Sequence, residues 1–153
     1  MKTRITFIAL LLIAFSVTSL AQKNDVDEAR KTIEEFKEKD PGMNKFFSSS
    51  HSYAVFPGIG KGGLGVGGAA GKGTLFKGGV AVADTKMSQV TVGFQAVGQK
   101  YAEINFFENE ETYKDFVSGN FEFAAQVSAV ALASGASADA AYKDGLLVVT
   151  MAI

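Results

Sequence analysis

The first regular pattern along the chain is helical. Between positions 24 and 39, apolar residues recur at spacings of three or four and charged residues fill the flanks; the apolar positions are Val26, Ala29, Ile33 and Phe36. This spacing predicts an amphipathic helix over Asn24–Lys39. The segment Asp40-Pro41-Gly42 ends it, because proline disfavours the helical backbone in the residue before it. A second, short helix is expected over about Gly42–Phe47.

Further along the chain, the hydrophobic pattern changes to a period of two. From Tyr53 onward, apolar and small residues alternate in short runs that are interrupted by glycine, by lysine or by the sequence Asp-Thr-Lys. Such alternation is typical of half-buried strands. The predicted strands are Tyr53–Ile59, Gly63–Ala70, Leu75–Ala83, Val90–Val97 and Ala102–Phe107.

The last third of the chain predicts one more helix and further strands. Asn109 is a good N-cap and two glutamates follow it, so a short helix is expected from there to Gly119. The apolar face of this helix comprises Tyr113, Phe116 and Val117. Residues Phe121–Ala133 alternate again, and Gly145–Ile153 reads as a strongly apolar final strand.

Together these elements predict a single α+β domain over residues 22–153. Its core is expected to be a curled, largely antiparallel sheet or a barrel-like sheet, with the N-terminal amphipathic helix and a short helix near residues 109–118. The final strand is apolar on both faces and stops at Ile153 without the polar cap that natural edge strands use to prevent pairing with other chains. We therefore expect the domain to be incomplete at its C-terminus.

The first 21 residues form a separate unit. Lys2 and Arg4 precede a run of thirteen mostly apolar residues, and the sequence SLA at residues 19–21 resembles the small-residue motif before a signal-peptidase cleavage site. This arrangement is typical of a secretory signal peptide, and the run is shorter than the roughly 20 apolar residues of a membrane-spanning helix. We expect cleavage before Gln22 and a periplasmic or secreted protein.

Composition restricts the chemistry that the domain can perform. The chain has no cysteine and one histidine, His51, so it cannot build a disulfide framework, a cysteine-rich zinc site or a haem attachment. Its 15 basic and 16 acidic residues give a net charge of −1, which argues against nucleic acid as a partner. We expect a non-enzymatic domain without a cofactor or a bound metal.

A glycine tract runs from Gly58 to Gly79, where eleven of twenty-two residues are glycine. The pattern G-x-G-x-x-G recurs in it, but a dinucleotide site needs a helix next, and the strand alternation continues instead. The Walker A pattern also fails, because Gly73 stands where serine or threonine is required. Glycines on one strand face favour close packing or strong curvature of the sheet. Alternatively, backbone N–H groups at the ends of the tract can hold an anionic head group.

Charge is distributed unevenly around this tract. Residues 41–83 carry four lysines and no acid, whereas residues 22–40 and 84–153 are net acidic. Each lysine taken alone has the ordinary interpretation of a solvated turn residue, but three of them lie at or near the glycine-rich turns. If they converge, they form one electropositive surface suited to anionic phospholipid. The candidate lipid-binding residues are Lys61, Lys72, Lys77, Gly62, Gly63 and Gly73.

Two blocks of the chain resemble the signature of the SYLF-domain family. The first block is SYAVFP at residues 52–57, followed by GIGKGGLGVGG at 58–68 and GKG at 71–73. The second is GFQAVGQ at 93–99, which leads through Ile104 and Phe106-Phe107 to the helix with Phe116, and the alanine-rich residues 121–138 are similar too. The resemblance implies a mixed α+β, barrel-like fold that binds phospholipids. It implies phosphoinositide ligands in eukaryotic members, actin binding in some of them, and no enzymatic activity.

The expected function is therefore non-enzymatic binding of anionic phospholipid or a membrane surface in the bacterial cell envelope. The first helix carries more acid than base, so we do not expect phosphoinositide specificity, and a secreted protein would not meet actin. The alternative is a structural or partner-binding envelope module, whose protein partner the sequence does not identify. An outer-membrane barrel, the third class, is disfavoured by the two predicted helices.

Overall fold

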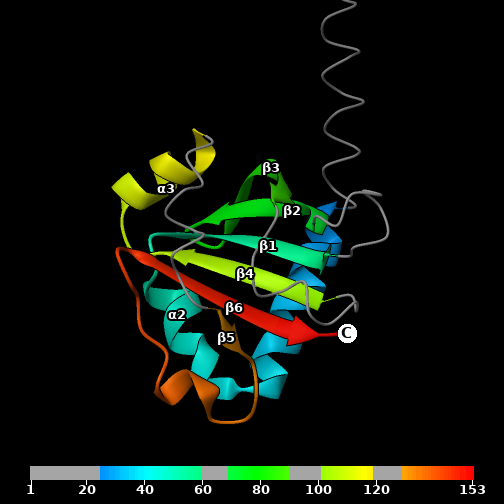
Figure 1. The fold of residues 1–153 in the computed structure, drawn as a ribbon, viewed down its shortest axis with the longest axis vertical. Coiled ribbons are helices and arrows are strands. Elements are labelled where there is room, and N and C mark those ends of the chain that lie inside the picture. Colours follow the sequence, from blue (N-terminus) through cyan, green and yellow to red (C-terminus); the bar gives the residue numbers. More distant parts are fainter. Residues whose placement is uncertain (1–24, 60–68, 90–100, 119–128) are drawn as a thin grey trace, which may run out of the picture.

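The computed structural model describes residues 25–59, 69–89, 101–118 and 129–153 (Figure 1). The helices are α1 (residues 25–39), α2 (Asn44–Ser49) and α3 (Glu110–Val117), and short 3-10 turns occupy Pro41–Met43 and Ala136–Ala138. The strands are β1 (Ser52–Ile59), β2 (Ala69–Lys77), β3 (Val80–Gln89), β4 (Tyr101–Phe107), β5 (Val130–Ala131) and β6 (Leu146–Ala152).

The six strands form one curled sheet in the order β3-β2-β1-β4-β6-β5. Neighbouring strands are antiparallel except β5 and β6, which run parallel. Among the described strands the sheet does not close into a barrel, because β3 and β5 remain its two edges. The predicted α+β class with a curled, largely antiparallel sheet is confirmed.

The strand predictions have different outcomes. Strands β1, β4 and β6 confirm three of them, and the helices at residues 25–39, 44–49 and 110–117 lie where the pattern placed them. The single strand predicted over Leu75–Ala83 is wrong: a turn at Gly78–Gly79 divides it between β2 and β3. Both glycines have positive φ, 61° and 79°, which is the geometry of a two-residue hairpin turn. Apolar residues continue on both sides of this turn, so periodicity alone does not reveal it.

Several predictions fall outside the described residues. Of the strand expected over Gly63–Ala70, only Ala69 and Ala70 are described, and they begin β2. The strand expected over Val90–Val97 and the signal peptide at residues 1–21 lie outside entirely. Within Phe121–Ala133, residues 121–128 lie outside, and Val130–Ala131 form β5.

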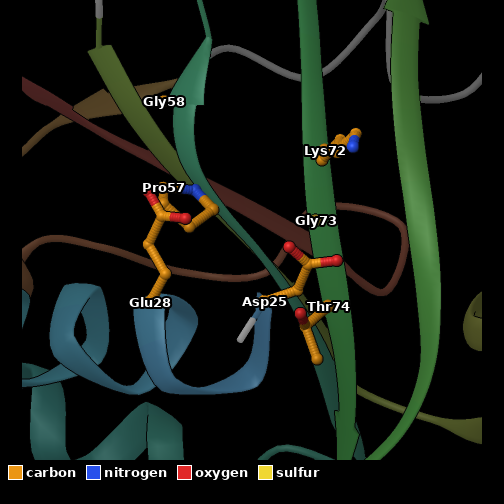
Figure 2. A pocket seen from close by; sticks show the side chains of 7 residues that line it. All are labelled: Asp25, Glu28, Pro57, Gly58, Lys72, Gly73 and Thr74. Atoms are coloured by element: carbon orange, nitrogen blue, oxygen red, sulfur yellow. The ribbon is translucent and has the colours of Figure 1, made fainter. Parts of the chain in front are cut away.

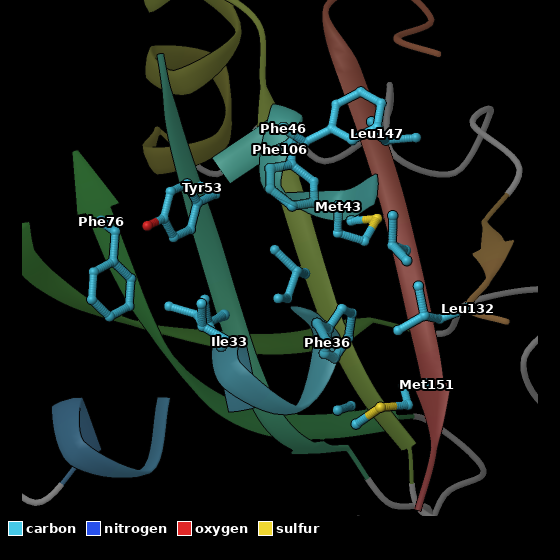
Figure 3. Close-up of a cluster of buried hydrophobic side chains, with 14 of the residues drawn as sticks. Ile33, Phe36, Met43, Phe46, Tyr53, Phe76, Phe106, Leu132, Leu147 and Met151 are labelled. Carbon is cyan, nitrogen blue, oxygen red and sulfur yellow. The ribbon is translucent and has the colours of Figure 1, made fainter. Parts of the chain in front are cut away.

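Helices α1 and α2 cover one face of the sheet, called here the helix face (Figure 1). Of the four predicted apolar positions, Ala29, Ile33 and Phe36 are buried and Val26 is partly buried, which confirms the amphipathic interpretation of α1. Figure 3 shows this cluster, in which α1 and the segment after it meet side chains of four strands. Its members include Met43, Phe46, Tyr53, Phe76, Phe106, Leu147 and Met151.

The opposite face of the sheet, called here the α3 face, carries a second apolar cluster. Its members include Phe56, Ile59, Leu75, Phe107, Phe116, Leu146 and Val148. Helix α3 is fixed over this face by the N-cap that the sequence predicts: Asn109 Oδ1 accepts hydrogen bonds from Thr112 N and Thr112 Oγ1, each at 2.9 Å. The cap satisfies a backbone donor that the first turn of the helix would otherwise leave unpaired.

The end of α1 is held by a hydrogen-bonded carboxylate. Asp40 is buried, and its Oδ2 accepts from Ser137 N at 2.7 Å while its Oδ1 accepts from Gly42 N at 3.1 Å. The hydrogen bond from Ser137 is the main reason why the pKa of Asp40 lies below its usual value. This contact joins positions 97 residues apart and so helps to fix α1 over the sheet.

Candidate functional site

The structure separates two of the lysines that the sequence grouped together. Lys72 and Lys77 are five positions apart on β2, and side chains of a strand alternate between its faces, so the two point to opposite faces of the sheet. Lys72 lies beside α1 on the helix face, whereas Lys77 Nζ lies 6.0 Å from the ring centroid of Tyr113 in α3. The two therefore do not form one basic surface. Lys61, Gly62 and Gly63 lie outside the described residues.

Gly73 has a structural role that agrees with the close packing expected of the glycine tract. A Cβ at this position would come within 2.6 Å of two Phe56 ring carbons and 2.9 Å of the Val55 carbonyl oxygen. Real Cβ atoms do not make such contacts, so strands β1 and β2 can pair here only around a glycine. The predicted part that Gly73 plays in lipid binding remains an expectation.

One end of the β2–β3 hairpin exposes a mixed apolar and basic surface, which we call the hairpin tip and define as Arg30, Lys77, Val80 and Val82. The side chains of Val80 and Val82 are 61% and 47% exposed, although valine is a residue that normally lies inside. Lys77 is exposed directly before the turn, opposite Val80 in the strand register. The hairpin tip thus brings two exposed valines to the turn together with Lys77, which lies toward Tyr113 on the α3 face.

Arg30 joins the hairpin tip from α1 and was not singled out in the sequence. Its Nη2 donates a 3.4 Å hydrogen bond to Gly79 O, and its guanidinium lies 5.2 Å from the ring centroid of Phe76. Stacking on an aromatic ring leaves the guanidinium charge available to solvent. No signal along the chain links position 30 to position 79, because the contact depends on how α1 crosses the sheet.

A cavity of about 330 Å³, which we call the Lys72 pocket, lies between the first turn of the described part of α1 and strands β1 and β2 (Figure 2). Its lining residues are Asp25, Glu28, Pro57, Gly58, Lys72, Gly73 and Thr74. Lys72 thus lies in a pocket with two carboxylates from α1, although the sequence around it contains no acid. As a site for a purely anionic head group, the position of Lys72 is unfavourable because both carboxylates would repel such a group.

The α3 face holds a buried polar pair within its apolar surroundings. Glu103 and Asn105 are 3% and 2% exposed and lie on the same face of β4. Burial raises the pKa of Glu103 to about 8, and a hydrogen bond from Asn105 offsets part of that rise. Asn105 Oδ1 has no hydrogen-bond partner in the described part of the chain. A carboxylic acid that keeps its proton near neutral pH therefore lies in the sheet.

Two other features that the sequence raised have ordinary surroundings. His51 Nδ1 lies 3.0 Å from Ser52 Oγ, and its ring centroid lies 5.8 Å from that of Tyr113. The acids Glu110 and Glu111 occupy the first turn of α3, where the helix dipole favours negative charge. Across the described ranges, no three histidine, cysteine, aspartate or glutamate side chains are grouped so that they could hold a metal ion.

Comparison with protein-family models and with curated proteins gives no relative for this chain. No protein-family model matches its sequence, and no curated protein matches it either. The helices that the structure describes include none with both the length and the apolar character needed to span a membrane. The hairpin tip and the Lys72 pocket are therefore the two candidate functional features of the described residues.

Proposed function

We propose that this chain is a non-enzymatic, SYLF-like lipid-binding domain of the bacterial cell envelope, periplasmic or secreted after removal of residues 1–21. The hairpin tip carries the proposal, because two exposed valines adjoin a turn that Lys77 flanks and that Arg30 reaches from the helix face. An anionic membrane surface complements both the cations and the valines. The cations attract lipid phosphate groups, and the valine side chains become buried at the boundary between head groups and acyl chains.

The magnitudes are sufficient for reversible association. Each cation near an anionic surface contributes about 1 kcal/mol, so Arg30 and Lys77 together favour binding roughly thirtyfold. Partial burial of Val80 and Val82 adds roughly 1 kcal/mol each. Acidic residues of α1 oppose the attraction. Because the screening length at physiological salt is about 8 Å, the charges nearest the membrane, at the hairpin tip, dominate the electrostatic part of the binding free energy.

A vesicle assay on surface variants tests the proposal. The protein is expected to co-sediment with phosphatidylcholine vesicles that contain phosphatidylglycerol, and added salt should weaken this binding. Lys77→Gln should lower the affinity roughly fivefold, and the double variant Val80→Ser and Val82→Ser by about tenfold or more. Two matched controls remove the same side chains elsewhere: Val117→Ser, at a valine 49% exposed on α3, and Lys143→Gln, at an exposed lysine. Both should bind like the unaltered protein.

The alternative function is a structural or partner-binding envelope module. It is favoured by β3, which forms an edge of the sheet with ten residues and no neighbour on its outer side among the described strands. Such an edge can accept a strand from another protein. Folded hairpin-tip variants that sediment as well as the unaltered protein, or an unaltered protein that ignores anionic vesicles, would contradict lipid binding through the hairpin tip and leave this alternative.

A further inference from the structure

The Lys72 pocket brings both signs of charge to one small cavity. Figure 2 shows the carboxylates of Asp25 and Glu28 extending from α1 toward the strands, with Lys72 farther along β2. The ion pairs of the described residues are Lys37–Glu34 and Lys114–Glu110, so the charges of the Lys72 pocket are not paired with one another. Two carboxylates and one ammonium group therefore line the cavity without an ion pair among them.

Thr74 adds a hydroxyl group to the lining of the Lys72 pocket. It is 1% exposed and lies on β2 two positions from Lys72, so the two side chains face the same side of the sheet. A hydroxyl group both donates and accepts hydrogen bonds, so a ligand atom of either kind in the cavity can pair with it.

We propose that the Lys72 pocket binds a phosphoethanolamine group, a compact zwitterion with one ammonium and one phosphate. The ammonium donates charge-assisted hydrogen bonds to Asp25 and Glu28, and the phosphate accepts from Lys72. The Thr74 hydroxyl group completes the site. The inference rests on the proposed lipid binding only for the source of the group, which is either a phosphatidylethanolamine head or the free compound.

Other head groups fit the same cavity less well. A phosphatidylglycerol head has no cation to offset the two carboxylates, and a choline head has no N–H with which to donate to them. The cavity volume of about 330 Å³ lies at the lower end of the range for small-molecule sites, as suits a ligand of a few heavy atoms. The Lys72 pocket should therefore distinguish ethanolamine from choline by the N–H groups of the ligand, and ethanolamine from glycerol by its positive charge.

Titration with soluble phosphoethanolamine, followed by NMR, tests the Lys72 pocket directly. The unaltered protein should bind it at least tenfold more tightly than phosphocholine, and Lys72→Gln or Glu28→Gln should each weaken binding about tenfold, the loss expected for one charge-assisted hydrogen bond. Glu35→Gln on the exposed side of α1 and Lys143→Gln serve as matched controls and should bind normally. Equal binding of the two compounds, or unchanged binding by folded Lys72 and Glu28 variants, would overturn the inference.

Thr74→Val separates ligand binding from folding. It removes the hydroxyl group while keeping a β-branched side chain in a strand, so the variant should remain folded. Binding of phosphoethanolamine should nevertheless weaken severalfold. Normal binding of phosphoethanolamine by the folded variant would contradict the role given to Thr74.

Vesicles distinguish failure of this inference from failure of the proposed function. Adding phosphatidylethanolamine to phosphatidylcholine vesicles should increase the amount of protein bound, and Glu28→Gln should abolish this increase. Adding phosphatidylglycerol should also increase the amount bound, and Lys77→Gln should reduce that increase. Response to phosphatidylglycerol alone, with no binding of the soluble zwitterion, supports the hairpin tip and overturns the inference. Binding of the soluble zwitterion without any vesicle binding supports the Lys72 pocket with the free compound as its ligand and overturns lipid binding.

Discussion

Glu103 is the residue through which pH should most affect stability. An unfolded glutamate loses its proton near pH 4.5, whereas burial holds the proton of Glu103 to about pH 8. Between these values the native state binds more protons than the unfolded state, so stability is full below pH 4.5 and falls as pH rises through 8. The total loss is roughly 3 to 5 kcal/mol. Glu103→Gln should remove it.

The measurement is urea unfolding of the unaltered protein and Glu103→Gln at pH 5 and pH 9. The variant should be more stable by several kcal/mol at pH 9 and should match the unaltered protein within about 1 kcal/mol at pH 5. Glu111→Gln, at an exposed position in α3, should change stability little at either pH. If the difference between Glu103→Gln and the unaltered protein did not grow with pH, a neutral Glu103 in the native state would be ruled out.

Among the described glycines of the tract, Gly73 is the one at which an added methyl group should lower the free energy of unfolding most. Gly73→Ala forces a Cβ against the Phe56 ring and the Val55 carbonyl group, and overpacking of this kind costs about 1 to 3 kcal/mol. Gly58→Ala is the matched control, because its Cβ would meet no atom within 4 Å. Thermal unfolding should place Gly73→Ala well below Gly58→Ala, and equal melting temperatures would refute the close approach of β1 and β2.

Helix α3 illustrates how one side chain fixes an element. Asn109→Ala removes the acceptor for Thr112 N and for Thr112 Oγ1, and loss of such a cap typically costs about 1 kcal/mol. Asn109→Asp keeps an acceptor and adds a negative charge at the positive end of the helix, so it should retain the stability. Urea unfolding of both variants decides the point: similar losses in the two would mean that the cap does not hold α3.

The β2–β3 hairpin shows where a sequence pattern misleads at the scale of elements. Leu75–Ala83 reads as one strand because apolar residues stand on both sides of Gly78 and Gly79. A Gly-Gly pair between two such runs is itself a hairpin signal, and both glycines adopt the positive φ that this turn requires. The local turn chemistry thus outweighs the hydrophobic period, and the resulting reversal is what exposes Val80 and Val82 at the hairpin tip.

At the scale of the whole molecule, charge along the chain differs from charge in space. Residues 41–83 carry no acid, and the sequence therefore predicts one basic surface there. Helix α1 crosses the helix face and brings Asp25 and Glu28 beside Lys72, while it brings Arg30 to the hairpin tip. The fold thus converts a predicted anion site at Lys72 into a pocket of mixed charge and adds a cation near Lys77.

The sequence by itself determined the α+β class, the amphipathic helix α1, the capped helix α3 and the strands β1, β4 and β6. Each of these follows from spacing or capping within a few residues, which are properties of the local backbone. Only the tertiary structure decided that Lys72 and Lys77 face apart, that Arg30 meets Gly79, and that Glu103 is buried. These facts depend on strand register and on the path of α1 across the sheet, which arise from contacts between residues distant in the chain.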